Sequence, residues 1–128
     1  MTATRSLAEV AEAYVSFIRT GQHEECRDTL YAENASSEEP SALEGVCDEI
    51  VTTGIEAIKQ KSNRFFSYFD IEHVTISDPF LHGNEAFAVT FTYKVLHRGS
   101  GEHFDSHEIA VFTVEGGKIM REVFYQQP

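Results

Sequence analysis

The chain has 128 residues, of which 41% are hydrophobic and 12% are aromatic, and its formal net charge is −11 at pH 7. This length predicts one domain over residues 1–128, and the hydrophobic content is high enough for a packed core and too high for a disordered chain. A surface this acidic repels phosphate backbones and anionic lipid head groups, so we expect no nucleic acid and no membrane surface as a partner.

The cysteines and the N-terminus bear on the compartment. Cys26 and Cys47 form neither a CxxC motif nor a disulfide framework, which is typical of free thiols in a reducing compartment, although a single bridge stays open as an alternative. The N-terminus lacks the apolar core of a signal peptide, and no stretch approaches about 18 continuous apolar residues. We therefore expect a soluble, cytoplasmic protein.

Two helices are predicted at the start of the chain. Ser6 and Glu9 have the spacing of a capping box, and apolar residues follow at helical spacing until Gly21, so the first helix is expected over about 5–20. Tyr14 lies in the middle of its apolar stripe. A second helix is expected over about 22–32.

The next segment, "SSEEPSALEGVCDEIVTT", is irregular and acidic, and it contains Pro40 and Gly45. It predicts a short strand followed by a solvated loop. A second capping box, Thr53 to Glu56, begins a third helix that continues to about residue 68. That helix is expected to place its cationic residues on the solvent side: Lys59, Lys61 and Arg64.

From residue 70 onward, β-branched and aromatic residues dominate, which favours strands. Strand-like runs cover 71–81 and 85–97, and "HEIAVFTVEGGKIMREVFYQQ" predicts a hairpin that turns at Glu115-Gly116-Gly117. Three helices followed by four long antiparallel strands indicate an α+β fold. The helices can cover one face of such a sheet, and the other face still carries apolar groups, so we expect a homodimer through that open face.

Three segments together resemble the nuclear transport factor 2-like superfamily, in particular its SnoaL-like and ketosteroid isomerase-like branches. They are "VAEAYVSFIRTG" running into "LYAENASSEEP", then "GIEAIKQKSNRFF", and finally "EIAVFTVEGGKIMREVFYQ". The resemblance implies a cone-shaped barrel, in which a strongly curved, mostly antiparallel sheet wraps around three N-terminal helices. It also implies a deep apolar pocket at the wide end. Members with this fold include isomerases, cyclases, dehydratases and binding proteins, so the fold alone does not give the function.

The isomerase branch implies a tyrosine on the first helix, a carboxylate base before a proline and a second carboxylic acid near the end of the chain. Tyr14 and Glu39 match the first two. Ala110 stands at the position of the second acid, but Glu108 lies two residues earlier on the same strand face. A carboxylate that faces an apolar cavity has a raised pKa and can transfer protons near neutral pH, and a tyrosine can stabilise an enolate-like oxygen. The alternative is that both acids are solvated and Tyr14 is a core residue.

His73 is either a structural residue or a proton shuttle beside a pocket carboxylate. His103, Asp105 and His107 share a strand face, but a metal site needs further ligands from other elements, so no metal is predicted. No phosphate loop or nucleotide motif is present, and we therefore expect no cofactor. Seven aromatic residues are expected to build the ligand pocket and the core: Phe17, Phe65, Phe66, Phe91, Tyr93, Phe112 and Phe124.

Two hypotheses of function follow. In the first, Glu39 or Glu108 moves a proton on a small hydrophobic carbonyl compound without a cofactor, helped by Tyr14 or His73. In the second, the pocket binds a small hydrophobic or neutral molecule without chemistry, or the aromatic residues fill the cone and the protein acts through its dimer surface.

Overall fold

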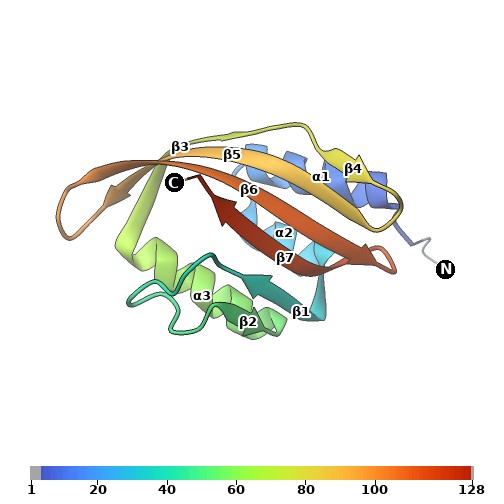
Figure 1. The fold of residues 1–128 in the computed structure, drawn as a ribbon, viewed down its shortest axis with the longest axis horizontal. Coiled ribbons are helices and arrows are strands. Elements are labelled where there is room, and N and C mark those ends of the chain that lie inside the picture. Colours follow the sequence, from blue (N-terminus) through green and yellow to red (C-terminus); the bar gives the residue numbers. More distant parts are fainter. Residues whose placement is uncertain (1–3, 128) are drawn as a thin grey trace.

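The computed structural model describes residues 4–127, and they form an α+β cone in which three helices pack on the concave side of one large sheet (Figure 1). The family-type fold predicted from the sequence is confirmed. In chain order the elements are α1 (Leu7–Arg19), α2 (His23–Leu30), β1 (Tyr31–Glu38), β2 (Val51–Thr53), α3 (Ile55–Tyr68), β3 (Phe69–Ile76), β4 (Phe80–His82), β5 (Ala86–His97), β6 (His103–Glu115) and β7 (Lys118–Gln126).

The sheet has the strand order β2-β1-β7-β6-β5-β3, with β4 paired to β5 beside this path. The pairing is antiparallel except between β1 and β7, which run parallel. The sheet does not close into a full barrel, because β2 and β3 remain edge strands. The sheet therefore forms an open cone.

The first helix begins as the sequence predicts. The Glu9 backbone N–H donates to Ser6 Oγ at 3.2 Å, and the Ser6 N–H donates to Glu9 Oε1 at 2.9 Å, which completes the capping box. The second helix ends earlier than predicted, because Tyr31 already pairs with Ile119 of β7. A sheet partner from the far end of the chain therefore decides where α2 stops.

The third helix differs from the prediction at its start. Thr53 belongs to β2, and the N-cap residue is Gly54, which has φ 95° and forms no side-chain cap. A positive φ of this size is accessible to glycine at little cost, which explains the residue at this position. The predicted exposure of the cationic residues is wrong for Lys61, because its side chain is 8% exposed.

The core is built around aromatic rings between α1 and the sheet. The Tyr14 ring lies 4.5 Å from that of Phe112, and the Phe112 ring stacks on that of Phe87 at 4.6 Å. Phe112 is fully buried, and Phe17 packs against the same cluster. These two aromatic residues, expected at the pocket, therefore lie in the core.

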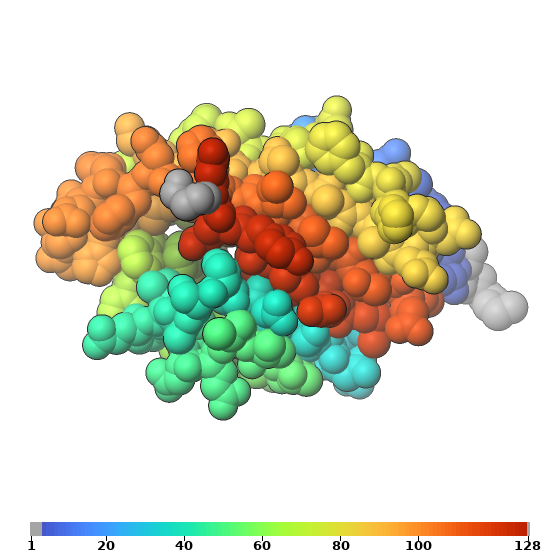
Figure 2. All heavy atoms as spheres, in the orientation of Figure 1, coloured from blue at the N-terminus to red at the C-terminus, as the bar shows by residue number. Residues whose placement is uncertain are grey.

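The convex face of the sheet is not covered by any helix of residues 4–127 (Figures 1 and 2). It carries large apolar side chains, among them Ile109 and Tyr125, which are paired across β6 and β7 and are 47% and 55% exposed. The apolar second face predicted from the sequence is present.

Three further observations concern thiols, metals and membranes. Cys26 and Cys47 are buried and free. Among residues 4–127, no group of His, Cys, Asp or Glu side chains is placed to hold a metal ion. None of the helices in this part of the chain combines the length and the apolar character that crossing a membrane requires.

Candidate functional site

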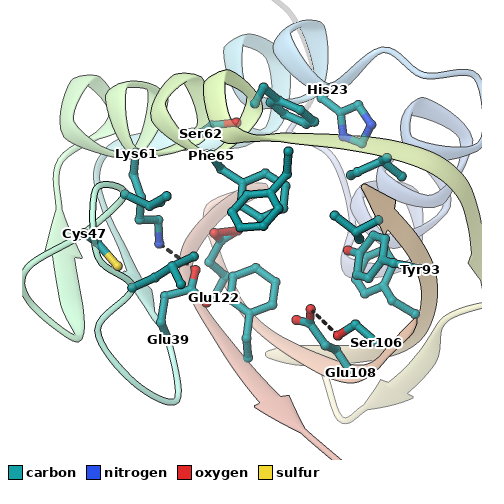
Figure 3. A pocket seen from close by; sticks show the side chains of 18 of the residues that line it. His23, Glu39, Cys47, Lys61, Ser62, Phe65, Tyr93, Ser106, Glu108 and Glu122 are labelled. Carbon is teal, nitrogen blue, oxygen red and sulfur yellow. Dashed lines mark hydrogen bonds and ion pairs between the residues drawn. The ribbon is translucent and has the colours of Figure 1, made fainter. Parts of the chain in front are cut away.

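A cavity of about 380 Å³ lies between α2, α3 and the concave face of the sheet (Figure 3). Its size is within the range of small-molecule pockets. The surface is hollowed where the end of β7 meets the segment after β1 (Figure 2), and the cavity is lined there by Pro40, Leu43 and Gln126.

Nine of the 28 residues that line the cavity are Phe or Tyr. Five of the seven aromatic residues predicted for the pocket line it: Phe65, Phe66, Phe91, Tyr93 and Phe124. Phe69 and Phe104 also line it and were not predicted. Phe65 stacks on Phe69 at 4.9 Å and Phe91 on Tyr93 at 5.2 Å, which fixes the rings in place.

Glu108 projects from β6 into this aromatic space, as strand parity with Ala110 predicts. Burial raises the pKa of its carboxyl to about 7, and the negative charge of Glu39 adds to this, while a hydrogen bond from Ser106 Oγ at 3.4 Å acts in the opposite direction. Within residues 4–127 the carboxyl has no salt-bridge partner. Glu108 therefore changes protonation state near neutral pH without a cation to hold it.

Glu39 follows the last residue of β1 and also lines the cavity. Its position is fixed by two contacts. Its backbone N–H donates to the Ile50 carbonyl at 2.9 Å, and its carboxylate pairs with Lys61 Nζ at 2.9 Å. The two predicted carboxylates thus share one cavity but have different environments, one unpaired and one held by an ammonium group.

Behind Glu39 lies a buried polar network that the sequence analysis missed. Tyr31 Oη and Ser37 Oγ both donate to the Glu122 carboxyl, the latter at 2.7 Å, and Lys61 Nζ donates to Ser37 Oγ at 2.7 Å. Burial raises the pKa of Glu122, while the two hydroxyl donors and the Lys61 charge act to lower it. The network joins β1, β7 and α3 at one end of the cavity.

Tyr14 lines the cavity from α1. Burial, followed by the charge of Glu122, raises the pKa of its hydroxyl well above the usual value, so the group stays a neutral donor. Among residues 4–127, the Tyr14 hydroxyl has no hydrogen-bond partner. Every fully buried side-chain oxygen of these residues does have one, so the Tyr14 hydroxyl is not fully buried and can be reached by a ligand in the cavity.

The remaining predicted site residue, His73, is not in the cavity. It lies exposed on β3, where its ring is 3.3 Å from Thr75 Oγ1. The histidine that does line the cavity is His23 of α2, which the sequence analysis did not single out. Cys26 also lines the cavity, but burial raises the pKa of its thiol to about 12, so it is not a nucleophile at neutral pH.

The arrangement is suited to proton transfer. It combines a carboxyl that ionises near pH 7, the neutral hydroxyl donor of Tyr14 and a wall that is largely apolar and aromatic. No side chain of this set is an activated nucleophile of the Ser–His or Cys–His type.

Comparisons with known proteins agree with this fold. A family model described as the SnoaL-like domain matches residues 5–126. A solved structure from Mesorhizobium loti, described as a SnoaL-like polyketide cyclase, is 28% identical, with 94% of this chain and 99% of that chain covered and a TM-score of 0.85.

Two more distant structures share the fold. One, described as an isomerase from Bacillus subtilis, is 19% identical over 94% of this chain and 85% of its own, with a TM-score of 0.74. The other, a nuclear transport factor 2-like protein from Burkholderia thailandensis, is 13% identical over 97% and 92%, with a TM-score of 0.78. No curated protein matches the sequence.

Proposed function

Because the chain belongs to the SnoaL-like domain family, we propose that it catalyses cofactor-free acid/base chemistry on a small, hydrophobic carbonyl compound. Glu108 is the proton-transferring group. The observation that supports this best is the carboxyl of Glu108 in an aromatic cavity, without a cationic partner among the described residues.

The proposed step begins with ionised Glu108, which removes a proton from the carbon next to the carbonyl group. The C–H electron pair forms a carbon–carbon double bond, and the negative charge moves to the oxygen, where the Tyr14 hydroxyl stabilises it by a hydrogen bond. Protonated Glu108 then returns the proton to the same or another carbon. Isomerisation, aldol-type cyclisation and dehydration all begin with this step.

Glu39 has a different part in this proposal. Its carboxylate is paired with the ammonium group of Lys61, so it is a weaker candidate for the base than Glu108. Burial is the main cause of the raised pKa of Glu108, and the negative charge of Glu39 raises it further, toward the range needed for catalysis at neutral pH.

One observation favours a second function, ligand binding without chemistry. Glu39 and Glu122 have their partners within the protein, which leaves Glu108 as a single carboxyl able to orient a ligand. In this alternative, a molecule that binds in the cavity is released without chemical change.

Deuterium exchange tests the proposal with a defined probe. We expect the protein to accelerate incorporation of deuterium next to the carbonyl of 2-tetralone in D2O above the rate in buffer alone, measured by mass spectrometry. The acceleration should require Glu108, and the Glu108→Gln variant is the control. A protein that binds 2-tetralone but leaves its exchange at the buffer rate contradicts catalysis and supports ligand binding.

We also propose that the protein is a cytoplasmic homodimer. Two buried free thiols are consistent with a reducing compartment. The proposed contact is the convex face of the sheet, because the large apolar side chains of Ile109 and Tyr125 would be exposed to water in a monomer.

The dimer is tested by Ile109→Glu. We expect light scattering to give twice the 14.4 kDa chain mass for the unaltered protein and the single mass for this variant, because the change brings two carboxylates into an apolar contact. Gln60→Glu on the exposed side of α3 is the matched control and should keep the dimer mass. A single mass for the unaltered protein at micromolar concentration would refute the homodimer.

A further inference from the structure

His23 is the first residue of α2, and its ring lines the cavity. The ring lies 5.9 Å from that of Phe66 at an interplanar angle of 55°, so it has a packed and defined position. Figure 3 shows His23 and Glu108 on opposite sides of the cavity. A ligand between them would contact both.

The ring nitrogens of His23 are free to bind a ligand. The hydrogen bond found at this residue uses its backbone carbonyl, which accepts from Arg27 Nη1 at 3.3 Å. Among residues 4–127, neither ring nitrogen of His23 has a hydrogen-bond partner, whereas every fully buried side-chain nitrogen has one. The ring nitrogens of His23 are therefore not fully buried.

The charge state of this imidazole is set by its surroundings. Burial lowers the pKa of His23, and the nearby Arg27 cation lowers it further, so the ring is neutral at pH 7. A neutral imidazole keeps one N–H donor and one acceptor nitrogen. A neutral N–H donor can polarise the carbonyl group of a ligand while it leaves the base, Glu108, ionised.

Tyr14 is a second hydrogen-bond donor that lines the cavity. Tyr14 and His23 come from adjacent helices, α1 and α2, and both line the cavity. A ligand oxygen within reach of both residues would have two donors, and Glu108 lies across the cavity from His23 (Figure 3).

We propose that His23 is a catalytic residue that donates a hydrogen bond from its neutral imidazole to the carbonyl oxygen of the ligand. This role rests on the proposed function. As Glu108 removes the proton from carbon, the growing negative charge on the oxygen is shared between the N–H of His23 and the hydroxyl of Tyr14. The imidazole keeps its proton throughout, and Glu108 returns the proton that it removed.

Binding of 2-naphthol, a stable enol analogue, tests this contact without turnover. We expect binding to shift the side-chain N–H signal of His23 in ¹⁵N NMR spectra recorded at pH 7. We also expect the dissociation constant, measured by fluorescence, to rise about tenfold in His23→Phe, since one hydrogen bond is lost while the ring packing on Phe66 is kept.

Two further variants separate donation from structure. His23→Gln retains an N–H donor and should recover part of the affinity and of the 2-tetralone exchange rate, which should fall by about 10²-fold in His23→Phe. His73→Phe, which alters an exposed histidine outside the cavity, should bind and exchange as the unaltered protein does.

The outcomes distinguish this inference from the proposed function. If exchange requires Glu108 but His23→Phe binds 2-naphthol unchanged, the role of His23 is refuted and the function stands. If exchange is absent while 2-naphthol still shifts the His23 signal, the catalytic function fails and the oxygen contact stands. Absence of 2-naphthol binding overturns the inference.

Discussion

Replacement of Lys61 by Met is expected to lower the free energy of unfolding by about 2–3 kcal/mol at pH 7. The ammonium group is nearly buried and donates to both Ser37 and Glu39. Met fills a similar volume, so the loss comes from charge and hydrogen bonding. Without Lys61, the carboxylate of Glu39 loses its partner, and the buried Glu122 loses a nearby positive charge.

Lys59→Met is the matched control for this prediction. Lys59 lies two residues earlier on α3 and pairs with Asp28 at 2.5 Å, but its side chain is 30% exposed and that of Asp28 is 52% exposed. Surface pairs of this kind contribute little to stability, so the control should unfold like the original protein in urea. Equal urea midpoints for the two variants would mean that the buried network does not stabilise the fold.

Local patterns were sufficient to predict most of the fold. The capping box at Ser6 and Glu9, the helical period of α1 and the turn between β6 and β7 depend on neighbouring residues, and each of these elements forms where expected. The predictions failed where distant chain segments decide. Tyr31 leaves the helix because β7 is available as a partner, which no local pattern shows.

The misplacement of Lys61 has a physical reason. A lysine is usually exposed, so the residue was assigned to the solvent side. Its position gave a contrary signal, since it lies three residues after Ile58 and four before Phe65, on the edge of the apolar face. The carboxylates that make its burial favourable are Glu39, just after β1, and Glu122 of β7, and sequence spacing does not bring them together.

Glu122 was missed for another reason, a β-bulge. Val114 pairs with Ile119, but Thr113 pairs with Arg121, so β7 contains one extra residue at this point. A strict count from the inward-facing Ile119 would turn Glu122 to the convex face, and the bulge returns it to the inside. Between Glu108 and Ala110 the pairing of β6 with β5 is regular. The two side chains therefore point to the same face, as predicted, and Glu108 lines the cavity.

Catalysed exchange is expected to depend on pH through Glu108. The base must be ionised, so the rate should rise with pH, reach half its maximum near pH 7 and then level off. Glu108→Gln should lower the plateau rate by about 10²–10⁴-fold, because the amide cannot accept the proton. A flat profile between pH 5 and 9 would contradict the assignment of Glu108 as the base.

Stability provides a check that needs no ligand. The pKa of Glu108 is higher in the folded protein than the usual value, so the folded state holds this proton more tightly than the unfolded state. The resulting stabilisation is complete below about pH 4.5 and is lost as the pH rises through about 7. Glu108→Gln removes this contribution, so its unfolding free energy should vary less between pH 5 and 8.

Glu39→Gln then decides which carboxylate is the base. If Glu108 is the base, removing the negative charge of Glu39 lowers the pKa of Glu108, and the half-maximal rate moves to lower pH with activity retained. If Glu39 is the base, the variant is inactive at every pH. The two carboxylates share one cavity, but Glu39 is paired with Lys61, whereas Glu108 has no salt-bridge partner among residues 4–127, which is why we expect a shifted profile.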